Sequence, residues 1–151
     1  MNQAQPTAND LAAQVAEFMS QRDLFAQKLG IRLEALRPGY SRVSMKLTPD
    51  MANGHGLPHG AVIFALADFA FATACNSHGQ TAVALSMDIH FIASPDPLSR
   101  LEAEATEVHC GKRTGLYKMV VRTEEGLLVA ELHGMAYRKK DTFLQPKDHE
   151  A

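Results

Sequence analysis

The sequence predicts an α+β fold in which an antiparallel sheet of about six strands wraps around one long buried helix. Residues 61–75 are almost entirely apolar, with Asp68 as their only ionisable side chain. A helix that is apolar on every face is buried on every face. Six other stretches alternate apolar and polar residues, which is the period of a strand with one buried face. They lie on both sides of the apolar run, so the helix is expected to interrupt the strands.

The elements are predicted as follows. Asn9 or Asp10 can cap a first helix, because apolar residues follow them at helical spacing. A second helical piece over residues 22–28 stops before Gly30, a residue that commonly ends helices. The expected strands are residues 31–35, 42–47, 83–91, 101–106, 117–122 and 128–138. Such a sheet keeps two open edges, which pairing in a dimer would cover.

The composition narrows the class of protein. The 151 residues, 46% of them hydrophobic, suffice for one globular domain. We expect a helical segment (residues 1–28), the main domain (29–140) and a tail (141–151). A net charge of -2 argues against nucleic-acid binding, and no apolar run reaches the roughly 18 residues of a membrane span. The start of the chain lacks a secretory signal pattern, so the cytoplasm is the expected compartment.

The loop before the buried helix, residues 53–60, is the predicted active site. It carries Asn53, two histidines and three glycines. Glycine lets a backbone approach a ligand closely, and a helix N-terminus offers unpaired N–H groups at the positive end of its dipole. Asp68 follows two turns into the helix, where a carboxylate must find a partner or shift its pKa. A cradle for a carbonyl oxygen is thus followed by a buried acid or base.

No metal site is expected from the spacing of candidate ligands. His55 and His59 are four residues apart, but the glycine and proline between them prevent the helix that would make such a pair chelating. Cys75 and Cys110 form neither a metal-ligand spacing nor a disulfide framework.

At these positions the chain resembles the hotdog-fold acyl-CoA thioesterases, and among them the phenylacetate-degradation thioesterases. Their motif N-G-H-x-x-x-H-G-G is present at residues 53–61, with Ala61 in place of the last glycine, and is followed by Leu-Ala-Asp at residues 66–68. Further matches lie at residues 71–72, 74–77, 111–112 and 114–115, and the resemblance covers residues 29–138. It implies a hotdog fold and hydrolysis of phenylacetyl-CoA or its ring-hydroxylated relatives to the free acid and CoA. It also implies a homodimer with sites at the interface, assembled into a homotetramer.

The resemblance also assigns roles to residues. The backbone N–H of Gly60 would polarise the thioester carbonyl, and Asp68 would act either as general base or as the nucleophile of a mixed anhydride. Asn53 would orient the attacking water or hold the thioester, and His59 would shape the loop and help to hold the carbonyl. Asn53 and Gly60 of one subunit would face the aspartate of its neighbour. Without the resemblance, Asn53 could be a turn residue and Asp68 a hydrogen-bonded structural residue.

The binding of CoA itself is predicted less directly. Lys112, Arg113 and Thr114 lie in a turn whose basic residues could contact the phosphates of CoA, or could form a solvated hairpin turn. CoA is part of the substrate, so no cofactor is expected. Some relatives place a hydroxyl near the site, where this chain has Ala84; Ser86 is one step along the same face.

Two other functions remain open. A hotdog hydratase or dehydratase would use His59 for proton transfer at the acyl chain, and an acyl-CoA-sensing module would bind without turnover. The acyl pocket is equally open, because its candidate side chains could line a pocket or belong to the core. These candidates are Phe64, Phe69, Phe71 and Met87.

Overall fold

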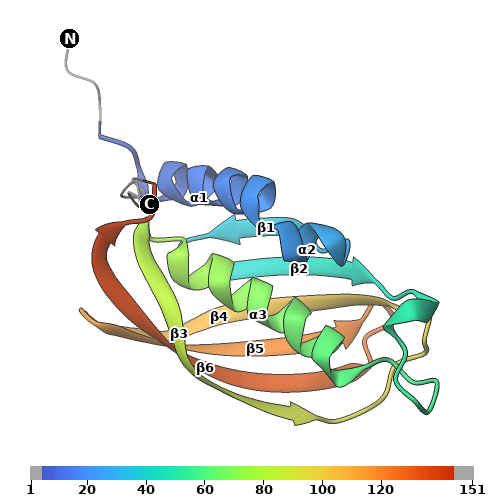
Figure 1. Ribbon diagram of the computed structural model, residues 1–151. Coiled ribbons are helices and arrows are strands. Elements are labelled where there is room, and N and C mark those ends of the chain that lie inside the picture. The colour runs from blue at the N-terminus through green and yellow to red at the C-terminus, as the bar shows by residue number, and fades with distance from the viewer. Residues whose placement is uncertain (1–4, 145–151) are drawn as a thin grey trace, which may run out of the picture.

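The computed structural model describes residues 5–144. Its helices are α1 (Ala8–Arg22), α2 (Leu24–Lys28), the 3₁₀ helix η1 (Pro49–Met51) and α3 (Gly60–Asn76). Its strands are β1 (Arg32–Arg37), β2 (Tyr40–Lys46), β3 (Gln80–Phe91), β4 (Arg100–Cys110), β5 (Thr114–Thr123) and β6 (Leu128–Thr142). The strands form one antiparallel sheet that curves around α3, as predicted (Figure 1).

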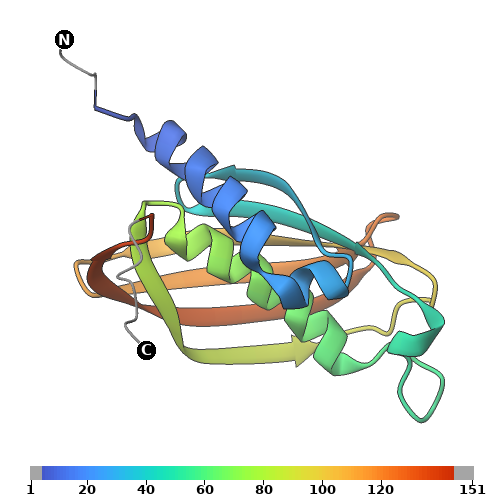
Figure 2. The same cartoon turned by 45° about the horizontal axis from the view of Figure 1, so that its top comes forward.

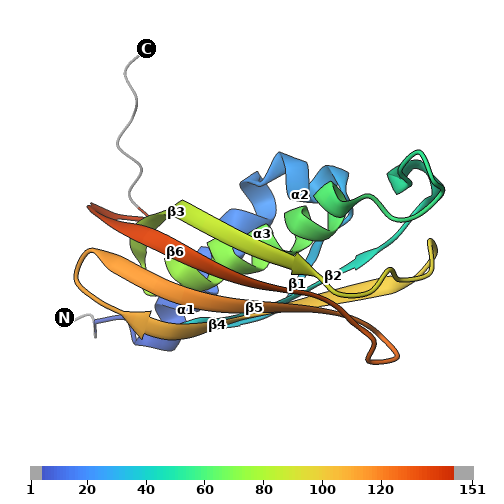
Figure 3. The same ribbon diagram turned by 90° about the horizontal axis from the view of Figure 1, so that it is seen from below.

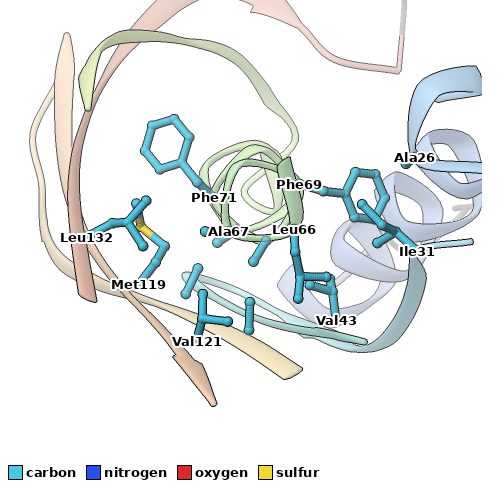
Figure 4. Packing of buried hydrophobic residues seen from close by; sticks show 14 of the residues in the cluster. Ala26, Ile31, Val43, Leu66, Ala67, Phe69, Phe71, Met119, Val121 and Leu132 are labelled. Atoms are coloured by element: carbon cyan, nitrogen blue, oxygen red, sulfur yellow. The ribbon is translucent and has the colours of Figure 1, made fainter. Parts of the chain in front are cut away.

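Helix α3 is buried because its side chains are apolar on nearly every face. Leu66 points toward Val43 of β2, and Phe69 points toward Ala26 of α2 and Ile31 (Figure 4). Phe71 packs edge-on against Tyr117 of β5, with 5.6 Å between the ring centroids. The helix therefore fills the space between the sheet and the N-terminal helices.

The predicted alternation of the strands is confirmed on the inner face of the sheet. Side chains that are no more than 1% exposed include Val43, Met45, Leu101, Ala103, Ala105, Tyr117, Met119, Val121 and Leu132. Those between them in the sequence point to the outer face, which no helix of the described chain covers (Figure 3).

The strand order is β1-β2-β4-β5-β6-β3, so β3 pairs with the last strand and not with its neighbours in sequence. Within the described residues β3 is therefore an edge strand, as β1 is at the other side. It exposes three large apolar side chains, Val83 (40%), Leu85 (58%) and Phe91 (56%). Exposed apolar residues on an open edge favour pairing with another chain.

The start of α1 differs from the prediction. The N-cap is Thr7, and neither Asn9 nor Asp10 fills this position. Thr7 Oγ1 accepts from the backbone N–H of Asp10 at 3.2 Å, and the Asp10 carboxylate accepts from the N–H of Thr7 at 2.9 Å. This reciprocal pair is a capping box, which needs the two residues three apart.

The N-terminal helix and the last strand extend the main domain at both ends. Ala12, Val15 and Met19 of α1 are buried, and the helix crosses α3 and β1 (Figure 2). Strand β6 extends to Thr142, beyond both the expected strand end at 138 and the expected domain end at 140. Residues 145–151 of the predicted tail lie outside the described residues. No helix among those described is long and apolar enough to cross a membrane.

Candidate active site

The loop before α3 is closed by its own backbone. Ala52 and Pro58 form a β-bridge, and the N–H of Asn53 donates to the carbonyl of Leu57 at 2.7 Å. The side-chain oxygen of Asn53 accepts from the N–H groups of His55 (2.9 Å) and Leu57 (3.1 Å). Asn53 therefore stabilises the turn of this loop, which is the structural role considered for it. Because its oxygen is used within the loop, the group that Asn53 offers to a ligand is its amide N–H₂ donor.

The first turn of α3 leaves one N–H group without a described partner. His59 is the N-cap, and its Nδ1 accepts from the N–H of Ala61 at 3.0 Å. The N–H groups of Val62 and Ile63 both donate to the carbonyl of His59. The N–H of Gly60 donates to no described group. It lies at the positive end of the helix dipole, where an oxygen carrying negative charge is favoured.

A hollow of about 260 Å³ lies beside Gly60, which is one of its lining residues. Asn53, Leu57 and Gly60 line the hollow, together with Phe91, the last residue of β3, and Ile92, which follows it. The Phe91 ring lies over Gly60, since a Cβ atom on Gly60 would be 3.1 Å from the tip of the ring. The sequence pattern places Phe91 only in a strand and does not single out Ile92, because no local signal connects the end of β3 with the loop.

Asp68 lies in the third turn of α3 and is half-buried. Its burial raises the pKa of this carboxyl above its ordinary value, and the negative charge of Asp23, the N-cap of α2, raises it further. No described hydrogen bond offsets the burial. Eight residues separate Asp68 from Gly60, which is about 12 Å along the helix axis. One chain therefore does not place the carboxylate beside the free N–H of Gly60.

The other predicted site residues lie elsewhere. Lys112 and Arg113 are exposed in the turn between β4 and β5, and Thr114 is the exposed first residue of β5. This turn lies at the end of the sheet opposite the loop (Figure 1). One chain does not bring them together with Gly60. Ser86 is exposed on β3, beside an irregularity in its pairing with β6.

The aromatic pocket candidates divide between the core and its margin. Phe69 and Phe71 are buried in the core, at 5% and 1% exposure. Phe64 and Met87 are partly buried and pack against it. None of the four lines the hollow beside Gly60.

Comparison with known proteins identifies the family. Residues 55–130 match the model of the Thioesterase superfamily. The chain is 39% identical to the acyl-coenzyme A thioesterase PaaI of Escherichia coli K12 over 127 residues, which are 84% of this chain and 91% of that protein. The structure of E. coli PaaI, a protein of the phenylacetic acid degradation operon, superposes with a TM-score of 0.87 at 37% identity, covering 90% of this chain and 99% of that one.

A mutant form of the phenylacetic acid degradation protein PaaI from Thermus thermophilus superposes with a TM-score of 0.73 at 38% identity, covering 76% of this chain and 98% of that one. The match of sequence and the match of the sheet around a central helix agree with one another. The chain therefore belongs to the Thioesterase superfamily, has its hotdog fold and is a thioester hydrolase.

Proposed function

We propose that this protein hydrolyses acyl-CoA thioesters whose acyl group is aryl or arylacetyl, phenylacetyl-CoA and its ring-hydroxylated relatives above all. The observation that carries this proposal is that the N–H of Gly60 has no partner among the described residues and that Gly60 lines a hollow together with the aromatic ring of Phe91. The similarity to PaaI of E. coli, a thioesterase of the phenylacetic acid degradation operon, supports the same substrate class.

The carbonyl oxygen of the thioester is held between two donors. The N–H of Gly60 supplies one, and the side-chain amide of Asn53 supplies the other. Both hydrogen bonds strengthen as negative charge develops on the oxygen during attack. One such donor increases the rate by a factor on the order of 10²–10³. His59 holds the loop by capping α3 through Nδ1, which leaves the proton of its neutral ring on Nε2.

Asp68 acts on this carbonyl from a second copy of the chain. A reacting carbon must lie about 3 Å from both the attacking group and the donors, and the same-chain Asp68 is about 12 Å along α3 from Gly60. Antiparallel pairing of β3 with β3 of a second copy reverses the second helix and brings its middle toward the first loop. It also covers the exposed Val83 and Leu85. Each dimer then has two sites, each built from both subunits, and two dimers form the proposed tetramer.

The same reversal gives the β4–β5 turn a role. In an antiparallel dimer, the turn end of one subunit lies beside the loop end of the other. Lys112 and Arg113 of one copy could then reach the phosphates of CoA bound at the loop of its partner, with Thr114 as a further donor. Charge-assisted hydrogen bonds to phosphate are stronger than neutral ones, so basic side chains suit this position.

The reaction has two routes through Asp68. As a general base, the carboxylate takes a proton from water, whose oxygen attacks the carbonyl carbon; the carbon–sulfur bond then breaks and CoA leaves as the thiol. As a nucleophile, the carboxylate attacks the carbonyl carbon, the carbon–sulfur bond breaks and CoA leaves as the thiolate, which takes up a proton. Water then hydrolyses the mixed anhydride, which releases the free acid and regenerates the carboxylate. Both routes need the ionised carboxylate.

Steady-state hydrolysis of a thioester panel tests the proposal. Phenylacetyl-, hydroxyphenylacetyl-, benzoyl-, short acyl- and long acyl-CoA are compared by release of free thiol for wild type and Asp68→Asn. Glu17→Gln, which changes an exposed carboxylate on α1, is the matched control. Wild type should hydrolyse the arylacetyl thioesters fastest. Of the two variants, only Asp68→Asn should lose most of kcat. Equal rates for Asp68→Asn and wild type would remove Asp68 from the mechanism, and equal rates across the panel would remove the substrate preference.

A further inference from the structure

A second cluster of chemically active side chains lies away from the loop, where the C-terminal end of α3 meets the ends of β4 and β5. Nε2 of His78 and the OH of Tyr117 both contact Oε2 of Glu107, each at 2.6 Å. The ligand atoms of His78, Glu107 and Cys110 all lie within 4.8 Å of one another. The catalytic proposal uses none of these residues.

A β-bulge brings this cluster together. Residues three apart in a regular strand point to opposite faces, so Glu107 and Cys110 should be separated by the sheet. The pairing of β4 with β5 shifts between Glu107 and His109. This shift returns Cys110 to the side of Glu107, and bulges commonly re-aim a side chain in this way next to functional sites.

The surroundings hold Glu107 in place from two further directions. Its backbone N–H donates to the carbonyl of Gly39 at 2.8 Å, and a Cβ atom on Gly39 would lie 3.0 Å from the Cβ of Glu107. The N–H of Gly39 in turn donates to the hydroxyl of Ser77 at 2.8 Å, beside His78. The turn between β1 and β2 thus ties the backbone of Glu107 to the end of α3 before any ligand binds.

We propose that His78, Glu107 and Cys110 form a binding site for a divalent transition-metal ion, with Zn²⁺ as the best match. Imidazole nitrogen, carboxylate oxygen and thiolate sulfur are the three ligand types that zinc takes in proteins. Tetrahedral zinc separates such ligands by about 3.3–3.6 Å. In the cluster, Nε2 of His78 and Oε2 of Glu107 are 2.6 Å apart, and all three ligand atoms lie within 4.8 Å of one another. Small side-chain rotations therefore suffice.

The charges and the access are also suitable. Two anionic ligands balance the charge of the ion, and the thiol proton of Cys110 leaves as the ion binds. The guanidinium of Arg138 is close to the cysteine but donates to the carbonyl of Gly111 at 2.6 Å, which directs it toward the backbone. His78 and Glu107 side chains are 26% and 22% exposed, which leaves a path for the ion and a place for water as the fourth ligand. The OH of Tyr117 orients the carboxylate from the far side, as outer ligands of metal sites do.

Titration of the reduced, metal-stripped full-length protein with Co²⁺ tests this site. Wild type should bind one ion per chain and develop the near-ultraviolet absorption of a thiolate–cobalt bond. Cys110→Ser should lose that absorption, whereas Cys75→Ser, the thiol control, should keep it. His78→Gln should weaken binding, and His90→Gln, an exposed histidine outside the cluster, should not. Tyr117→Phe should weaken Co²⁺ affinity roughly 10–100-fold, as the loss of an outer ligand does.

Circular dichroism and thermal unfolding without metal establish that each variant is folded. X-ray absorption of the Zn²⁺-loaded wild type needs no variant, and should show one sulfur at about 2.3 Å with nitrogen or oxygen neighbours at about 2.0 Å. The proposal is overturned if wild type binds no stoichiometric Co²⁺, if the thiolate absorption survives in Cys110→Ser, or if no sulfur neighbours the zinc. The cluster is then only a hydrogen-bonded anchor between α3 and the sheet.

Discussion

Mixed dimers provide the sharpest test of where the catalytic groups come from. Asn53→Asp keeps the oxygen that accepts from His55 and Leu57 but removes the amide donor. Asp68→Asn keeps the shape of its side chain but removes the ionisable carboxylate. Each variant alone should be nearly inactive, because every site lacks either the donor or the acid.

The structure determines what a mixture of the two variants should do. The 12 Å or so along α3 between Gly60 and Asp68 is about four times the reach of a reacting group, so the proposed mechanism takes the carboxylate from the neighbouring chain. A dimer with one chain of each variant has one site that takes its loop from the Asp68→Asn chain and its acid from the Asn53→Asp chain, and a second site that carries both changes. The first site is intact, so protein purified through both tags should recover about half of wild-type kcat per chain as a dimer, and about a quarter to a half as a tetramer.

The assay is co-expression of the two variants with different affinity tags, purification through both tags, and measurement of thiol release from phenylacetyl-CoA. Each variant co-expressed with itself supplies the background. If doubly tagged protein forms and its activity stays at that background, the site lies within one chain and the interfacial arrangement is wrong. Substrate preference is not affected by that outcome, since wild type still hydrolyses the panel.

Three further predictions follow from the carboxylates and the core. Burial and the charge of Asp23 raise the pKa of Asp68, so the acid limb of the kcat/KM profile should lie at a pH above the ordinary pKa of aspartate. Asp23→Asn keeps the cap on α2 and should move this limb to lower pH. A pH–rate profile that does not move would contradict this. The folded state binds the Asp68 proton more tightly than the unfolded state, so ionisation of Asp68 destabilises the fold. Asp68→Asn should therefore raise the midpoint of thermal unfolding at neutral pH. This gain should vanish as the pH falls below 3.8, the ordinary pKa of the carboxyl. Gly134→Ala should lower the free energy of unfolding by about 1–3 kcal/mol in a urea titration, because overpacking is costly and the new Cβ would lie 2.9 Å from the ring of Phe71; an unchanged urea midpoint would show that the ring moves freely.

Burial at Glu107 acts against its hydrogen bonds. Burial alone would raise the pKa of this carboxyl, but the hydrogen bonds from Tyr117 and His78 outweigh it and hold the pKa below its ordinary value. An acid whose pKa is lower in the folded state stabilises the fold when the pH is above its pKa in the unfolded state. This stabilisation is lost as the pH falls through its pKa in the folded state. The free energy of unfolding, measured by urea titration, should therefore differ less between neutral and acidic pH in Tyr117→Phe than in wild type. A difference equal to that of wild type would contradict it.

Local patterns in the sequence determined the elements and predicted the location of the proposed site. The apolar run around Asp68 requires a buried helix because no face of it is suited to water, and the period of two requires strands with one buried face. The glycine-rich loop before the helix identified Asn53, His59 and Gly60, since a helix start and its cap are properties of adjacent residues. The motif in that loop also pointed to the family that the comparisons show.

Only the tertiary structure decided how these parts meet. Pairing of β3 with β6 depends on which edges remain free after the other strands have joined, so the sequence could not place Phe91 over Gly60. The unpartnered N–H of Gly60 likewise depends on what every neighbouring acceptor does. Glu107 and Cys110 lie beyond the predicted strand 101–106 but belong to β4. Regular alternation would place them on opposite faces of the sheet, and one shift of register in β4 puts them together. Sequence periodicity predicts the direction of a side chain only while the strand is regular. A bulge depends on how the strand pairs with its neighbours in the sheet.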